Sequence, residues 1–297
     1  MKIFDCFMYF DEDILLELRL NYLDKFVDKF IIIESSYNHK GEIRKPNFKI
    51  EKYKKFKNKI EYVLIKEQPK DIEEINVDDS EIKTNDKYIL NAAKRENFQR
   101  NHIKNCLSEA DINDWIIISD LDEIPNLEKI NFKNISHKFI FFKQDMMYYK
   151  FNLKLENCTW IGTKACKMKN LVSPQWLRNI KDRSYPWWRV DALFSKNKYG
   201  SIKFIIDGGW HFSYLKTPEE IEKKLKSYLH HREYELNPIG IEKIKILMNQ
   251  KKTVYNLKTD QRLNKFNSEN KLKKIEINHL PKYISDNQDK LKKWIEN

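Results

Sequence analysis

The chain has 297 residues, with 56 Lys and Arg against 44 Asp and Glu, and so a formal net charge of +12. Its six glycines, about 2% of the chain where about 7% is typical, form neither G-x-G-x-x-G nor G-x-x-x-x-G-K-[ST], which excludes glycine-fingerprint dinucleotide folds and Walker-A nucleotide hydrolases. With 41% hydrophobic residues and charges of both signs, the composition is that of a folded globular protein.

The N-terminal part predicts an alternation of strands and a helix. Apolar, β-prone runs predict three strands, at residues 2–8, 30–33 and 60–65. A helical stripe with spacing i, i+4, i+7 and i+11 lies between the first two runs: Leu16, Leu20, Leu23 and Val27. Asp11 or Asp13 is expected to cap this helix. Continuous apolar strands indicate an α/β fold with a mostly parallel sheet and helices on both faces.

Further elements follow a loop expected over residues 66–85. The pattern predicts helices at 86–109 and 217–232, the second with Thr217 as N-cap and Pro218 at its first position. Strands are expected at 115–118, 137–142, 146–153 and 202–206. We interpret the strands at 137–142 and 146–153 as a hairpin. The tryptophan-rich stretch 160–188 is expected to be irregular. Residues beyond 232 are Lys-rich and expected to be mostly helical.

Targeting signals are not recognisable in the sequence. No run approaches ~18 apolar residues, and MKIFDCFMYF lacks the features of a signal peptide. We therefore expect a cytoplasmic protein without a transmembrane helix. From Lys216 onward 19 Lys and Arg face 12 Asp and Glu, which indicates a solvated basic face or a peripheral contact with an anionic membrane or acceptor. No nucleic-acid-binding motif is present, so no nucleic-acid partner is expected.

The strongest chemical signal is Asp120-Leu121-Asp122, directly after the apolar run Trp115 to Ile118. In an extended segment, residues i and i+2 point the same way, so both carboxylates project from the carboxyl edge of the sheet. Such a pair repels unless a cation lies between the two groups. Mn²⁺ or Mg²⁺ bound together with substrate phosphates fits this arrangement. The alternative is a solvated turn with capping aspartates.

Two further signals accompany this pair. His211 follows Gly208-Gly209, two of the six glycines, and we expect it to complete the metal site rather than to be an ordinary core histidine. His230 and His231 are expected on a charged surface. Arg95 and Arg100 on the predicted helix suit a diphosphate, with helix-surface salt bridges as the equal alternative.

The combination of these segments resembles glycosyltransferase family 17, the β-1,4-mannosyl-glycoprotein 4-β-N-acetylglucosaminyltransferases. The segments that carry it are residues 4–12, 15–35, Arg95-Glu96 with Arg100, 119–125 and 209–213. The resemblance implies a GT-A-type nucleotide-sugar transferase fold, a UDP-sugar donor, a divalent metal ion and inversion at the anomeric carbon. We accordingly expect a GT-A-like catalytic domain over residues 1–235 and a helical, basic C-terminal extension over 236–297 packed on it.

These expectations give each candidate residue a role. Asp120, Asp122 and His211 would hold the metal ion, and the donor would meet residues at strand ends and on the long helix: Tyr9, Glu34, Ser35, Arg95, Arg100 and Asp120. Inversion needs a general base, for which Asp207 is the first candidate, followed by Asp191, Glu123 and Asp145. Tryptophans at 176, 187, 188 and 210 are either sugar-stacking platforms or buried packing residues.

The sequence thus predicts an inverting, metal-dependent glycosyltransferase that moves a sugar, N-acetylglucosamine by resemblance, from a UDP-sugar to a glycan or glycolipid hydroxyl. Two alternatives remain: a non-catalytic carbohydrate- or polyanion-binding protein, and a metal-dependent phosphotransferase.

Overall fold

The computed structural model describes residues 1–186, 188–189, 191, 194–228, 231–254 and 270–297. The strands are β1 (Ile3–Met8), β2 (Lys29–Ser35), β3 (Ile60–Ile65), β4 (Trp115–Asp120), β5 (Glu123–Pro125), β6 (Phe139–Phe142), β7 (Gln144–Tyr148), β8 (Leu153–Trp160), β9 (Lys164–Lys167), β10 (Ile202–Ile205), β11 (Gly209–Ser213) and β12 (Leu272–Lys274). The helices are α1 (Asp13–Leu23), α2 (Glu81–Asn101), α3 (Pro174–Asn179), α5 (Pro218–Ser227), α6 (His231–Leu236), α7 (Gly240–Asn249), α8 (Lys282–Asp286) and α9 (Gln288–Leu291).

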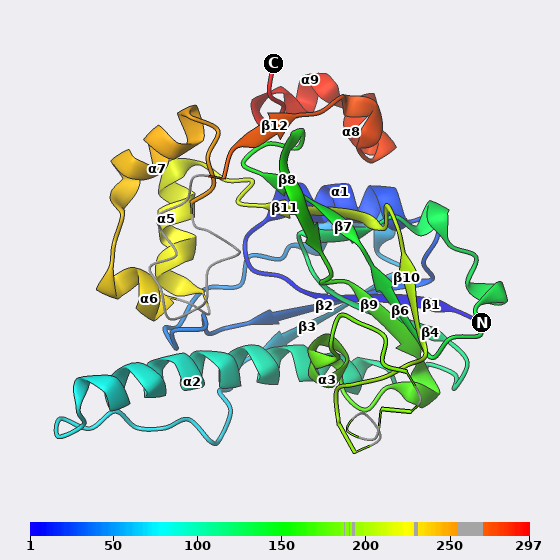
Figure 1. Cartoon of the computed structure of the whole chain (residues 1–297), viewed down its shortest axis with the longest axis horizontal. Helices are drawn as coiled ribbons and strands as arrows, with labels where there is room; N and C mark the ends of the chain where they lie inside the picture. The colour runs from blue at the N-terminus through cyan, green and yellow to red at the C-terminus, as the bar shows by residue number, and fades with distance from the viewer. Residues whose placement is uncertain (187, 190, 192–193, 229–230, 255–269) are drawn as a thin grey trace.

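Seven strands form the first sheet, in the order β10-β6-β9-β4-β1-β2-β3 (Figure 1). Strands β4, β1, β2 and β3 pair in parallel, and only β9 runs antiparallel to its neighbours. Alternate residues of β2 enter different cores: Phe30 and Ile32 pack with α1, whereas Ile31 and Ile33 face the side of α2 and α3. Burial on both faces explains why these strands are continuous apolar runs.

A second sheet has the order β12-β8-β7-β11-β5 and is mostly antiparallel. One face, with Trp210 and Phe212, joins the core around α1, and the other, with Met146 and Tyr148 of β7, packs with α5. The chain passes from the first sheet to the second between Asp120, the last residue of β4, and Glu123, the first of β5. This passage is the Asp120-Leu121-Asp122 segment.

The mixed α/β class is confirmed, and the strands expected at 2–8, 30–33, 60–65 and 115–118 are present. The hairpin prediction is wrong, because β6 and β7 belong to different sheets. The stretch 160–188 is less irregular than expected, since it contains β9 and α3. Two sheets are present where one was expected, because β5, β7 and β11 belong to the second sheet.

Three helix boundaries also differ from the predictions. The first helix has Glu12 at its N-cap, without a side-chain hydrogen bond, and neither Asp11 nor Asp13 caps it. Helix α2 begins five residues earlier than expected, at Glu81, because Ser80 accepts a hydrogen bond from the amide of Lys83. Helix α5 has the expected Thr217 cap but ends at Ser227, where Tyr228 adopts an extended conformation.

The C-terminal segment returns to the body of the protein. Strand β12 pairs antiparallel with β8, and α8 contacts α1. Residues 255–269 of the Lys-rich region lie outside the described residues. The division into domains at residue 235 stays a prediction. Among the residues that the structure describes, no helix has both the length and the apolar composition needed to cross a membrane.

Candidate active site

The turn that carries the two aspartates is held from behind by Arg19 of α1. This guanidinium is fully buried, forms an ion pair of 2.6 Å with Asp5, and donates hydrogen bonds to the backbone carbonyls of Asp120, Leu121 and Glu123. Leu121 is buried, so the carboxylates on either side of it point away from the core. The geometry of the turn is therefore fixed by the fold itself.

Asp120 lies between two arginines. Arg100 of α2 donates to Oδ1 and Arg178 of α3 to Oδ2, each at 2.9 Å. Burial alone would raise the pKa of the Asp120 carboxyl, but Arg178 and Arg100 outweigh burial and hold the pKa well below its usual range. Arg100 also pairs with Glu96 at 2.7 Å. A dense cationic cluster thus surrounds a carboxylate whose side chain is 35% exposed.

Glu123 lies beneath this cluster and is fully buried. Its carboxylate accepts hydrogen bonds from Arg178 at 2.6 Å, from Trp160 Nε1 at 2.6 Å and from the Asp120 amide at 2.9 Å. A Cβ atom on Gly162 would come within 1.7 Å of Glu123 Oε1, so glycine at 162 leaves room for this carboxylate. The carboxylate of Glu123, a candidate general base, is thus occupied by these donors and holds their groups in place.

Asp122 and His211 form a second pair. Antiparallel pairing of β5 with β11 sets His211 opposite Glu123, and His211 Nε2 lies 3.5 Å from Asp122 Oδ1. Burial would lower the pKa of His211, but the Asp122 carboxylate outweighs it and raises that pKa. His211 Nδ1 is buried without a hydrogen-bond partner among the described residues. The Trp160 ring lies 4.9 Å from the imidazole, between centroids.

Lysine side chains connect Asp122 to the short segment that follows β1. Lys224 Nζ of α5 lies 3.6 Å from Asp122 Oδ2 and 3.4 Å from Glu12 Oε1. Burial would raise the pKa of Glu12, but Lys224 and Lys216 lower it. Lys216 also pairs with Asp11 at 2.5 Å. The short segment after β1 and helix α5 therefore meet at Asp122.

The donor set fits a divalent ion held by two side chains rather than by three. An oxygen and a nitrogen 3.5 Å apart can share one ion at about 2.1 Å from each. Among the described residues, no three His, Cys, Asp or Glu side chains converge as a metal-binding group. The structure brings Asp122 and His211 together and turns Asp120 to the arginines.

The residues expected to meet the nucleoside are engaged within the protein. The Tyr9 hydroxyl donates to Asp13 at 2.7 Å. Glu34 is fully buried, pairs with Arg44 at 2.9 Å and accepts from the amides of Asn47 and Phe48. Ser35 Oγ accepts from the amide of Tyr37. These side chains fix the segment that follows β2.

The two arginines of α2 have different surroundings. Arg95 donates to Gln68 Oε1 at 2.7 Å and to the carbonyl of His39 at 3.2 Å, so it joins loops rather than reaching Asp120. Five residues apart on an α-helix, side chains project about 140° apart. Only Arg100 therefore faces the aspartate turn.

The other candidate bases lie away from Asp122. Asp207 is exposed, has φ of +50°, and lines a cavity of about 840 Å³ together with Asp145 and Trp210. Neither Asp122 nor His211 lines that cavity, because Trp210 and His211 are adjacent on β11 and point to opposite faces. Asp191 is tied to Arg189 at 2.6 Å and to Lys198 at 2.8 Å.

The tryptophans are spread over the molecule. Trp176 packs against Phe139 and Tyr199, and Trp210 is buried and donates from Nε1 to the carbonyl of His279 at 2.8 Å. Trp188 is 65% exposed, and Trp187 lies outside the described residues. Trp160, for which sequence reasoning gave no role, is the tryptophan beside His211.

Sequence reasoning missed Arg178, Lys224, Glu12 and Arg19. No sequence motif links Arg178 or Lys224 to the aspartate pair, and only tertiary packing brings them to the turn. Arg19 did carry a signal, because it lies between Leu16 and Leu23 on the apolar stripe of the predicted helix. A charge on such a stripe needs a buried partner.

The sequence was compared with curated proteins and with models of protein families. A search of curated proteins returns no match. The profile of glycosyltransferase family 17 matches residues 1–295, which include the C-terminal segment as well as the segments that carry the resemblance. Because this match covers nearly the whole chain, the protein belongs to glycosyltransferase family 17.

Proposed function

We propose that this glycosyltransferase moves N-acetylglucosamine from a UDP-sugar to a hydroxyl of a glycan or glycolipid, with inversion, on a GT-A-type fold. The observation that carries the proposal is the Asp120 carboxylate between Arg100 and Arg178, beside the Asp122–His211 pair. The family membership supports glycosyl transfer. The sugar and the nucleotide rest on the resemblance of the sequence segments.

The arginines supply the anion-binding part of the site. Arg100 and Arg178 direct their guanidinium groups to one partly exposed carboxylate. A guanidinium forms bidentate bonds with phosphate as readily as with carboxylate. In the proposed complex the donor diphosphate takes part of these bonds, and the developing charge on the leaving nucleotide is stabilised by groups already in place.

Asp122 and His211 would hold the divalent ion, Mn²⁺ or Mg²⁺. When bound, this ion acts as a Lewis acid that neutralises charge on the diphosphate. Lys224 now lies 3.6 Å from Asp122 and would shift toward Glu12, which it already contacts at 3.4 Å. His211 must present a neutral imidazole to bind the ion.

The proton of the acceptor hydroxyl is proposed to go to Asp207. This carboxylate and Asp122 lie on different sides of β11, so the proposal requires the segment after β10 to move when substrates bind. Asp207→Asn should then bind UDP normally and lose transfer. Full transfer by this variant would remove Asp207 from the mechanism and leave Asp191 as the next candidate.

The test of the proposed function is UDP binding with and without Mn²⁺, followed by hydrolysis of a panel of UDP-sugars. Asp122→Asn and His211→Gln should each reduce turnover by about 100-fold or more and abolish the Mn²⁺ dependence of UDP binding. Glu109→Gln, at an exposed carboxylate paired with Lys29, is the matched control. UDP binding that ignores Mn²⁺, or full activity in excess EDTA, would refute the metal site.

A further inference from the structure

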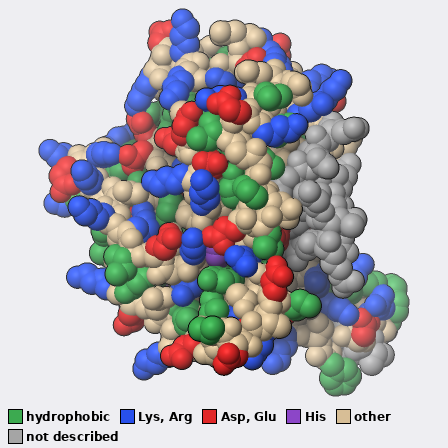
Figure 2. Space-filling view, turned by 90° about the vertical axis from the view of Figure 1, so that its left-hand side faces the viewer, with side chains coloured by type: hydrophobic (Ala, Val, Ile, Leu, Met, Phe, Trp, Pro, Cys, Tyr) green, Lys and Arg blue, Asp and Glu red, His purple; other side chains and the backbone are tan. Residues whose placement is uncertain are grey.

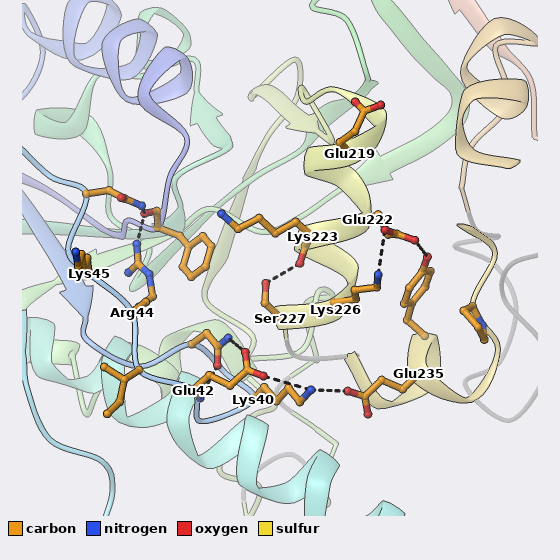
Figure 3. A pocket seen from close by; sticks show the side chains of 16 residues that line it. Lys40, Glu42, Arg44, Lys45, Glu219, Glu222, Lys223, Lys226, Ser227 and Glu235 are labelled. Atoms are coloured by element: carbon orange, nitrogen blue, oxygen red, sulfur yellow. Dashed lines mark hydrogen bonds and ion pairs between the residues drawn. The ribbon is translucent and has the colours of Figure 1, made fainter. Parts of the chain in front are cut away.

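A second cavity, of about 880 Å³, lies between the segment after β2 and helices α5 and α6 (Figure 3). Its size is within the range of about 300–1,000 Å³ that is usual for small-molecule sites. One wall comes from residues 38–47 and the other from residues 219–227 and 234–238. None of the residues assigned above to metal or diphosphate binding lines it.

The ionic groups of this cavity are unequally satisfied. Each of its four carboxylates has a lysine partner at 2.9–3.7 Å: Glu42, Glu219, Glu222 and Glu235. Arg44 is paired with Glu34 behind the wall. Lys45 and Lys223, by contrast, have no ion-pair partner among the residues that the structure describes. Two ammonium groups of the lining, those of Lys45 and Lys223, are therefore without a carboxylate partner in the described part of the chain.

These two lysines stand on opposite walls. Figure 3 shows Lys223 extending from α5 across the cavity toward Arg44, with Lys45 beside Arg44 on the other side. An anion that enters between the two walls would be attracted by both ammonium groups. Figure 2 shows that cations and carboxylates are interspersed on the surface over α5 to α7.

The cavity adjoins the proposed reaction site. Lys224, the residue after Lys223, contacts Asp122 and Glu12. Phe10, two residues before Glu12, lines the cavity. The Glu12–Lys224 ion pair thus connects the two segments that line the cavity to Asp122.

The remaining lining suits a sugar ring. Asn47 and Ser227 donate to the carbonyls of Phe10 and Lys223 and keep oxygen atoms that can accept hydrogen bonds. Phe10 and the 80% exposed Ile43 offer apolar surface. A pyranose presents hydroxyls at its rim and C–H groups on its faces, so both kinds of surface are used. The two free lysines add a requirement for negative charge.

We propose that this cavity binds the acceptor saccharide through an anionic group, a carboxylate or a phosphate, held between Lys45 and Lys223. The inference rests on the proposed glycosyl transfer and adds the chemical class of the acceptor. Each lysine donates a charge-assisted hydrogen bond to the anion, and the Glu12–Lys224 ion pair connects the segments that line the cavity to Asp122.

The experiment compares three hexoses that differ at C6: glucose, glucuronic acid and glucose 6-phosphate. Their binding to the full chain is measured by ligand-observed NMR, with and without UDP and Mn²⁺. We expect at least one charged hexose to bind about tenfold more tightly than glucose, and UDP not to displace it. The carboxylate and phosphate arms distinguish the two sources of charge.

The variants locate the site. Lys45→Gln/Lys223→Gln should lose the preference for the charged hexose, whereas Lys49→Gln/Lys243→Gln removes two exposed lysines outside the cavity and should retain it. Equal binding of glucose, retained preference in the first variant, or displacement by UDP would each overturn the proposal. Failure of Mn²⁺-dependent UDP binding in the wild type, with charged-hexose binding intact, would instead count against the proposed transferase function.

Discussion

At the scale of single residues, the site is a network of buried charges in which each group depends on the next. Arg178 is the link, since it pairs with Asp120 and Glu123 at once. Asp120 holds the pKa of the Arg178 guanidinium well above its ordinary value despite burial. Removing one member leaves another charge in the interior without a partner, which costs more than the pair itself contributes.

Arg178→Met should therefore lower the free energy of unfolding by about 3–5 kcal/mol, because Glu123 is fully buried. Urea denaturation at neutral pH measures this loss. Arg178→Lys should lose less, and Arg178→Met/Glu123→Gln should recover part of the stability by removing the stranded charge. A loss below about 1 kcal/mol in the single variant would show that Glu123 does not depend on Arg178.

His231 provides a pH dependence. It was expected at the surface, and that prediction is wrong: its ring is fully buried beside Tyr88, and its Nδ1 lies 2.9 Å from the carbonyl of Tyr228. Its neighbour His230 lies outside the described residues. Burial lowers the pKa of His231 below its ordinary value of 6.5. The unfolded chain therefore binds this proton more tightly than the folded protein does.

Stability that depends on His231 is complete above about pH 6.5 and falls as the pH drops toward the folded pKa. His231→Leu should flatten the decline in the urea midpoint between about pH 7 and pH 5. His137→Leu, at an exposed histidine, should leave the decline as in the wild type. An unchanged slope in the His231 variant would contradict the assignment.

At the scale of elements, sequence patterns succeed where one local cause dominates. Strands β1 to β4 follow from their uninterrupted apolar runs, and the start of α5 follows from Thr217 and Pro218. The patterns fail where tertiary pairing decides, as for β6 and β7, which lie two residues apart in the sequence but pair in different sheets. The length of an apolar run does not determine which strand it will pair with.

The candidate site divides in the same way. Asp120, Asp122 and His211 stand at strand ends or next to the glycine pair, so local sequence could indicate them. Their true partners come from α2, α3 and α5, and no spacing rule connects those helices to β4. The sequence therefore indicates the carboxylates of the site more readily than the cations that neutralise them.

The capping box of α5 offers an element-scale prediction. Thr217 accepts from the Glu220 amide, and Glu220 accepts from the Thr217 amide. Thr217→Ala should cost about 1 kcal/mol, measured by urea denaturation. Thr217→Ser keeps the hydroxyl and should behave as the wild type. Loss of stability in both variants alike would argue against the cap.

At the scale of the whole molecule, the C-terminal segment closes the fold by pairing with its middle. Asn152 is fully buried, donates to the carbonyl of Glu296 at 2.9 Å and accepts from its amide at 2.7 Å. The amide of Ile275 donates to the carbonyl of Asn152. One asparagine thus holds both ends of the final segment, in agreement with a family match that reaches residue 295.

Asn152→Leu should release this segment, since the backbone groups of Glu296 would lose their partners. Hydrogen exchange followed by mass spectrometry should show faster exchange over residues 272–297, and little change in β1 to β4. Asn134→Leu, at an exposed position, is the control. Unchanged protection of residues 272–297 would show that β12 and α8 hold the segment without Asn152.

Arg19 has a consequence for binding entropy. Every guanidinium nitrogen of this buried side chain is used, on Asp5, on Ser119 and on three carbonyls of the aspartate turn. The turn that joins the two sheets is therefore ordered as soon as the chain folds, and a donor nucleotide need not spend binding free energy on ordering it. Lysine, with three donors on one nitrogen, cannot make this set of bonds. The hydrogen bonds that Arg19 forms when the chain folds are thus the same ones that preorganise the site.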